Sequence, residues 1–129
     1  MKKVIFTLII IFVAQFNFAN ENDSLLIAAR NYSLKHNYTM AIKMYKEYVK
    51  VTEVIALKNV YIELANCYFK NEDKDSAVKT IVKAIESYGL TEEDFIYNQN
   101  IDAKLSDYAL AKVYNDLEKL QKKYLATLE

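Results

Sequence analysis

The chain has 129 residues, of which 53% are hydrophobic and 26% are charged, and its formal net charge is zero. This length fits one domain, and the apolar fraction suffices for a core, which argues against a mainly disordered protein. With no proline and one glycine, the sequence lacks the residues that usually interrupt helices, so we expect an all-α fold with short polar turns. The balanced, dispersed charge disfavours nucleic acid or an anionic membrane as partner.

The first 19 residues have the layout of a secretory signal peptide. Lys2 and Lys3 precede an apolar run over residues 4–14, and a more polar stretch follows and ends in Ala19. Because the run is too short to span a bilayer comfortably, we expect cleavage, no membrane insertion afterwards, and a periplasmic or secreted protein. Ala19 is a suitable residue before a cleavage site, but Asn17, two positions earlier, is bulky and polar, so the exact site stays open. Cleavage would leave 15 basic and 17 acidic residues.

Small and large apolar residues recur at helical spacing in the next part of the chain. One helix is predicted from Asp23 or Ser24 through His36, and a second follows Asn37, which is a suitable N-cap. The same residue types return 36 positions later, with Asp73 as the equivalent cap. Four further pairs share this offset: Ala29 and Ala65, Tyr32 and Tyr68, Ala41 and Ala77, and Tyr48 and Ala84. A small residue on each helix allows close approach, so we expect two helical hairpins over residues 22–53 and 58–89.

This pattern resembles the tetratricopeptide repeat, whose units place small, apolar and aromatic residues at fixed positions of two helices. The slots of the first unit are filled by Leu25, Ala28, Ala29, Tyr32, Ala41, Tyr45 and Tyr48. Those of the second unit are filled by Tyr61, Leu64, Ala65, Tyr68, Ala77, Ile81 and Ala84. The offset exceeds the family's usual period of about 34, so a longer connector is expected at Thr52–Leu57. Gly89 replaces the closing proline as a helix stop.

The last part, residues 90–129, is predicted to form capping helices. Thr91 is a suitable N-cap for a short acidic helix that ends near residues 98–100. Ser106 is expected to cap one long final helix, in which Leu110, Val113, Leu117, Leu120, Tyr124 and Leu128 form an apolar stripe. Two repeats are fewer than a solenoid normally needs, so this segment should cover the second repeat. The stretch from Gly89 to Leu117 also loosely resembles the end unit that follows such repeats in small exported bacterial proteins.

Chemical machinery is scarce in this sequence. There is one histidine, His36, in a predicted turn, and one cysteine, Cys67, beside a core tyrosine; a solvated turn and a core position explain them. The acidic cluster at residues 72–75 lacks the glycine and distant glutamate of a calcium loop. We therefore expect no enzyme activity, no metal and no cofactor.

The resemblance implies that the first helix of each repeat lines a concave binding face. The partner-binding residues that it implies are Arg30, Leu34, Asn59, Ile62, Asn66, Phe69 and Lys70, with Leu26, Ser33 and Glu63 beside them. Arg30 and Asn66 are 36 residues apart and should stand side by side, where they could hold a peptide carboxylate or carbonyl. The family's clamp for C-terminal carboxylates is not reproduced, because Leu26 and Ile62 stand where a lysine would be needed.

Two functions follow from this reading. The first is an exported, non-enzymatic scaffold that binds a peptide or protein partner on the concave face. The alternative is a structural subunit that self-associates through the amphipathic segment 107–128. The sequence leaves the choice between a monomer and a homodimer open.

Overall fold

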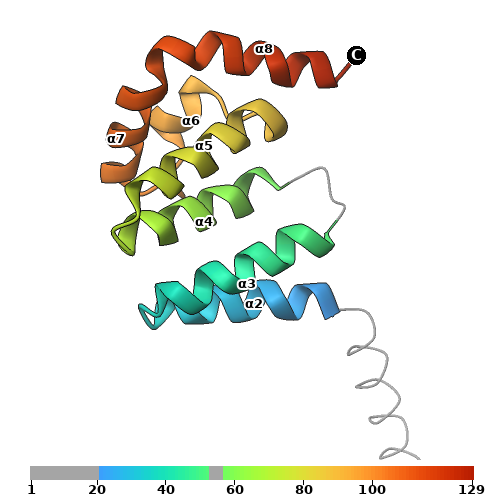
Figure 1. Cartoon of the computed structure of the whole chain (residues 1–129), viewed down its shortest axis with the longest axis vertical. Coiled ribbons are helices and arrows are strands. Elements are labelled where there is room, and N and C mark those ends of the chain that lie inside the picture. Colours follow the sequence, from blue (N-terminus) through green and yellow to red (C-terminus); the bar gives the residue numbers. More distant parts are fainter. Residues whose placement is uncertain (1–20, 53–56) are drawn as a thin grey trace, which may run out of the picture.

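The computed structural model describes residues 21–52 and 57–129, and its regular elements there are all helical (Figure 1). They are α2 (Glu21–Leu34), α3 (Tyr38–Val51), α4 (Lys58–Lys70), α5 (Lys74–Tyr88), α6 (Glu92–Tyr97), α7 (Ala103–Val113), the 3₁₀ turn η1 (Tyr114–Asp116) and α8 (Leu117–Thr127). The predicted all-α fold is confirmed. The predicted signal peptide (1–19) and most of the predicted longer connector (53–56) lie outside the described residues.

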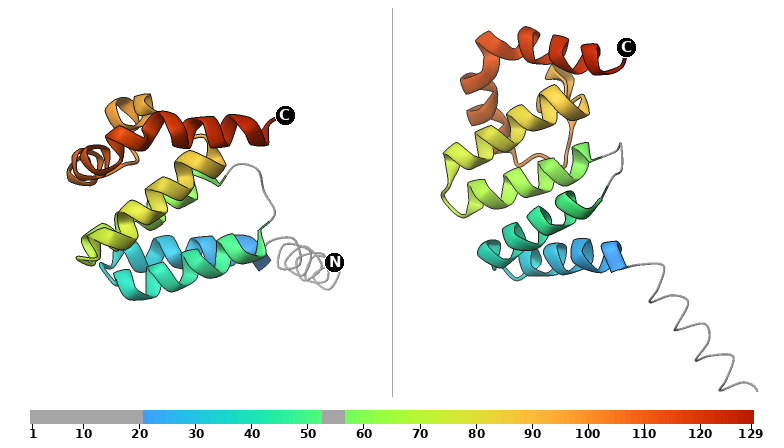
Figure 2. Two further views of the ribbon diagram at one scale, coloured as in Figure 1. Left: turned by 45° about the horizontal axis from the view of Figure 1, so that its top comes forward. Right: turned by 45° about the vertical axis from the view of Figure 1, so that its right-hand side comes forward.

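The helices form two stacked hairpins followed by a covering segment. Helix α2 packs along α3, α4 packs along α5, and α3 joins the two hairpins by packing on α4 (Figures 1 and 2). Helices α7 and α8 then pack on α5 and cover the end of the stack. The chain therefore builds its layers in sequence order, from α2 at one end to α8 at the other.

The turns of the two hairpins have the same backbone geometry. His36 and Glu72, which are 36 positions apart, both have left-handed backbones, with φ of 60° and 64°. In each turn the next amide donates a hydrogen bond backwards, to the carbonyl of Tyr32 at 2.8 Å or of Tyr68 at 2.9 Å. The repetition seen in the sequence thus extends to the conformation of the turns.

The predicted caps of the second helix in each hairpin are also confirmed. The Asn37 side chain accepts a hydrogen bond from the amide of Met40, and the Asp73 side chain accepts one from the amide of Ser76. Each cap satisfies an amide that the first helical turn leaves without a partner. The same device therefore starts α3 and α5.

The core consists of two clusters. Small residues at the helix crossings are fully buried, as the pattern predicted: Ala29, Ala41, Ala65 and Ala77. One cluster lies between α2, α3 and α4 and includes Tyr45, which is 1% exposed. The other lies between α4, α5 and the covering helices, with Ile81 and Leu105 fully buried. The covering segment thus supplies about half of the second core.

Gly89 ends α5 and also makes room for α8. Its φ of 75° is left-handed, and its amide donates to the carbonyl of Ala84, so the predicted helix stop is confirmed. A Cβ at this position would lie 2.7 Å from the ring of Tyr124 on α8. Glycine is therefore required both for the backbone conformation and for the close approach of the last helix.

The prediction of one long final helix beginning at Ser106 is wrong. Helix α7 already begins at Ala103, after the N-cap Asp102, and η1 redirects the chain into α8 (Figure 1). Helix α7 packs on both α5 and α6, whereas α8 packs mainly on α5. A straight helix could not follow both surfaces, so the bend keeps Leu117 and Leu120 buried. The short acidic helix after Thr91 is confirmed as α6.

Candidate functional site

The candidate site is a hollow of about 300 Å³ between α2 and α4. The residues that line it are Arg30, Ser33, Leu34, Tyr45, Glu63, Asn66 and Lys70. The hollow therefore brings together four residues of the predicted binding face, Arg30, Leu34, Asn66 and Lys70. The two hairpins stack in the same orientation, with both short turns at the same edge, so α2 and α4 run in the same direction beside the hollow (Figure 1).

An ion pair crosses the hollow. The Nε and Nη2 atoms of Arg30 donate to the two carboxylate oxygens of Glu63 at 2.8 and 3.1 Å, and the hydroxyl of Tyr45 donates to the same carboxylate at 3.4 Å. The hydrogen bond to Glu63 raises the pKa of Arg30, despite partial burial. Burial, reinforced by the Glu63 charge, raises the pKa of the Tyr45 hydroxyl. Tyr45 therefore stays protonated and acts as a donor at neutral pH.

The ion pair between Arg30 and Glu63 leaves other groups of the hollow available to a ligand. A guanidinium has five N–H donors, and Glu63 takes up two of those of Arg30, whose side chain is 50% exposed. Lys70 is exposed and forms no ion pair with a carboxylate of residues 21–52 or 57–129. Leu34 is 78% exposed beside these groups. The hollow thus offers one excess positive charge, spare donors and an apolar contact.

Asn66 has a different role from the predicted one. Its amide nitrogen donates to the carbonyl of Asn100 at 2.7 Å, and its amide oxygen accepts from the backbone N–H of Asp102 at 2.9 Å. Asn66 lines the hollow, but its polar atoms hold the α6–α7 connection against α4. The prediction that it would face a ligand together with Arg30 is corrected accordingly, because its hydrogen bonds are used within the protein.

Three other predicted residues lie outside the hollow. Ile62 is fully buried, so its assignment to a partner-binding surface is wrong; it belongs to the core that the α6–α7 segment covers. Phe69 is partly buried, and its ring lies 6.0 Å from that of Tyr108 on α7. Asn59 is exposed but does not line the hollow. The covering segment explains why Ile62 and Phe69 are not free to meet a partner as predicted.

Sequence reasoning missed the roles of Glu63 and Tyr45. Glu63 was noted on the concave face without a partner, and Tyr45 was assigned to the core only. Tyr45 is indeed buried, with 1% exposure, but its hydroxyl reaches the carboxylate of Glu63. The opposite charges of Arg30 and Glu63 on facing helices were the available signal.

The isolated histidine and cysteine show no reactive arrangement. Cys67 is buried, as expected, and its thiol donates to the hydroxyl of Ser33 at 3.6 Å. Burial raises the pKa of this thiol, which keeps it protonated and weakly nucleophilic. His36 lies in the exposed turn, with Nδ1 2.7 Å from the hydroxyl of Tyr38. Within the described part of the chain, no three metal-ligating side chains come together.

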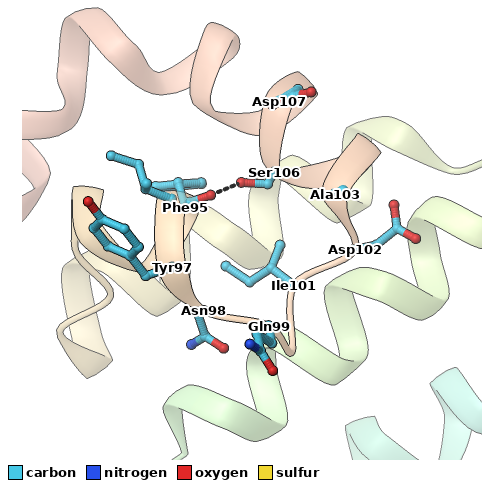
Figure 3. Close-up of a pocket in the computed structure, with 10 residues that line it drawn as sticks. Phe95, Tyr97, Asn98, Gln99, Ile101, Asp102, Ala103, Ser106 and Asp107 are labelled. Carbon is cyan, nitrogen blue, oxygen red and sulfur yellow. Dashed lines mark hydrogen bonds between the residues drawn. The ribbon is translucent and has the colours of Figure 1, made fainter.

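A second hollow, of about 540 Å³, lies between α6 and the start of α7. Its polar side chains are largely engaged in local structure. Ser106 donates to the carbonyl of Phe95 at 2.5 Å, and Asp102 caps α7. Figure 3 shows Tyr97, Gln99 and Asp102 pointing in different directions rather than toward one point. The hollow between α2 and α4 is therefore the better candidate, because its polar groups face one another.

The apolar stripe of the C-terminal segment is largely covered. Val113, Leu117 and Leu120 are buried, whereas Leu128 is 65% exposed. Lys123 on α8 also pairs with Glu86 on α5 at 3.7 Å, which fixes α8 on the second hairpin. The large apolar side chains of segment 107–128 that stay exposed for self-association are Tyr114, Leu125 and Leu128.

Comparisons with models of protein families, with curated proteins and with solved structures found no match. Among residues 21–52 and 57–129, no helix has both the length and the apolar character to cross a membrane.

Proposed function

We propose that this chain is an exported helical-repeat scaffold of the tetratricopeptide type, without enzymatic activity, and that it binds a peptide or protein segment in the hollow between α2 and α4. The observation that carries the proposal is the exposed side chain of Leu34, 78% accessible, beside the cationic groups of Arg30 and Lys70. An extended segment could place an apolar side chain on Leu34 and a backbone carbonyl or carboxylate on the cations.

Two further features support a binding role. Helix α3 packs on both α2 and α4 and holds them beside each other, so the hollow is formed before a ligand arrives. Preorganisation of this kind lowers the entropy cost of binding. The ion pair between Arg30 and Glu63 fixes the guanidinium in place, which reduces the rotamer freedom that a ligand would otherwise have to restrict.

Peptides selected from a random display library provide the test. Peptides that bind the wild-type protein should lose at least roughly tenfold in affinity when Leu34→Asp and Lys70→Glu are introduced together, since an apolar contact and an attractive charge are both lost. Lys46→Glu, at an exposed position of α3 away from the hollow, is the control for the charge change. Fluorescence anisotropy measures both. Equal affinities of the double variant and the wild type would contradict the proposal.

Self-association through segment 107–128 remains the alternative function, and the exposed Leu125 and Leu128 support it. It predicts a dimer that dissociates in a Leu125→Ser, Leu128→Ser variant. Light scattering over a range of concentrations separates the two functions, because a constant monomer mass excludes the alternative.

A further inference from the structure

An aromatic pair continues the surface of the hollow toward α7. Phe69 neighbours Lys70 on α4, and its ring lies 6.0 Å from the ring of Tyr108 on α7, at an angle of 47°. Both rings are partly exposed. Because Lys70 lines the hollow and Phe69 precedes it on α4, the aromatic pair adjoins the hollow.

Two lysines converge on this pair from different helices. The Nζ atom of Lys74, at the start of α5, lies 5.2 Å from the centre of the Tyr108 ring and 5.8 Å from that of Phe69. The Nζ atom of Lys112, on α7, lies 5.5 Å from the same Tyr108 ring. The electron-rich ring attracts each ammonium, although the two positive charges repel each other.

This surface carries three lysines. Lys70, Lys74 and Lys112 are exposed, and none of them pairs with a carboxylate in the part of the chain that the structure describes. The carboxylate that lines the adjoining hollow, Glu63, is already bound by Arg30. Glu72, Asp73 and Asp75 flank Lys74 in the chain but form no ion pair with it.

We propose that the segment bound by this protein is acidic, and that its Glu or Asp side chains lie over Lys74 and Lys112 beside the Phe69–Tyr108 pair. The inference depends on the proposed function, since the same segment would continue into the hollow and contact Leu34. Carboxylates of the bound segment would relieve the repulsion between the two ammonium groups. The methylene groups of the same acidic side chains would contact the aromatic rings.

Two synthetic probes test this inference. One is a short fluorescent peptide of glutamate, alanine and leucine, and the other has every glutamate replaced by glutamine. The acidic probe should bind the wild-type protein at least roughly fivefold more tightly, and the difference should shrink at high salt, because surface charges are screened over about 10 Å at 0.1 M. The Lys74→Gln, Lys112→Gln variant should lose this preference. The matched control is Lys79→Gln, Lys83→Gln, which removes two exposed lysines of α5 without touching the aromatic pair.

The outcomes separate the two proposals. Equal binding of the two probes to the wild type, or an equal loss of preference in the control variant, would overturn the acidic-segment inference. If Leu34→Asp then weakened both probes alike, the hollow would still stand as the binding site. If the preference for the acidic probe depended on Lys74 and Lys112 but not on Leu34, the lysine surface would be supported and the hollow contradicted. Circular dichroism checks that each variant remains folded.

Discussion

Helices α2 and α4 hold equivalent positions in the two hairpins, yet equivalent residues on them meet different surroundings. Leu26 on α2 is partly exposed, whereas Ile62, 36 positions later, is fully buried. Arg30 pairs across the hollow with Glu63, whereas its equivalent Asn66 binds the backbone of the α6–α7 connection. The repeat sets the backbone of each helix, while the neighbouring layer decides which side chains can meet a partner.

The difference bears on where the proposed binding surface lies. Helix α4 contacts the segment that follows α5 through Lys58, Asn66 and Phe69, whereas no contact of this kind is seen for α2 among the described residues. The uncovered part of the predicted binding face is therefore the edge that α2 shares with the end of α4. The predictions below test this division.

The largest effect is expected from truncation of the two equivalent apolar residues. Ile62→Ala should lower the free energy of unfolding by about 2–5 kcal/mol, because it removes a fully buried side chain from a packed core. Leu26→Ala should cost about 1 kcal/mol or less, since the side chain is already partly in water. Urea denaturation measures both values. Similar losses would show that α2 and α4 are covered to the same extent.

The equivalent polar residues Arg30 and Asn66 should also differ in their contribution to stability, with the larger contribution again on α4. Asn66→Ala is expected to cost about 1–3 kcal/mol, because it leaves the Asn100 carbonyl and the Asp102 amide without their partner. Arg30→Ala should cost about 1 kcal/mol or less, as expected for an ion pair at a half-exposed site. Hydrogen exchange provides a second measurement. Only the Asn66 variant should accelerate exchange in the α6–α7 connection, and acceleration by Arg30→Ala would contradict this assignment.

The turns are the feature that the two hairpins share, so glycine substitutions there should act alike. Glu72→Gly should stabilise the protein by up to about 1 kcal/mol, because glycine adopts a left-handed backbone without strain. His36→Gly should gain less, since it also removes the contact between His36 and the Tyr38 hydroxyl. Thermal unfolding measures the gain, and Lys79→Gly in the middle of α5 is the control that should destabilise. A loss of stability in Glu72→Gly would refute the shared geometry.

A small pH effect should report on the attachment of α6 to α4. Burial raises the pKa of Asp94, but hydrogen bonds from the Thr91 amide and Asn98, together with the Lys58 ammonium, outweigh burial and lower it. A lowered pKa in the folded state stabilises the protein above the unfolded value of about 3.9, and this contribution is lost as the pH falls further.

The matching variant is Asp94→Asn. It should be less stable than the wild type near neutral pH, and the difference should shrink as the pH falls below about 4. Urea denaturation at several pH values measures this. A difference that stays constant with pH would mean that the charge of Asp94 contributes nothing to the attachment.

Local features of the fold were predictable from the sequence because they depend on neighbouring residues. The caps Asn37 and Asp73, the stop at Gly89 and the start of α6 after Thr91 follow from short-range hydrogen bonding and backbone preference. The bend at residues 114–116 was not predictable, since it arises from packing on α5 and α6 rather than from a breaker in the sequence.

The site was predictable only in part, for the same reason. The resemblance implied that Arg30 and Lys70 lie on one face, and both line the hollow. That implication failed for Ile62, because an apolar residue outside the repeat slots is exposed or buried according to what packs on it. Likewise, the period alone could not show that the amide of Asn66 holds a backbone segment far along the chain.

The most direct test of the division between α2 and α4 is thiol labelling at equivalent positions. Leu26→Cys and Ile62→Cys, each introduced into a Cys67→Ala background, place one thiol on each helix. Under native conditions the thiol at position 26 should react rapidly, whereas that at position 62 should react at least roughly a hundredfold more slowly, since it becomes accessible only on opening of the covering segment. Equal reaction rates in two folded variants would contradict the account.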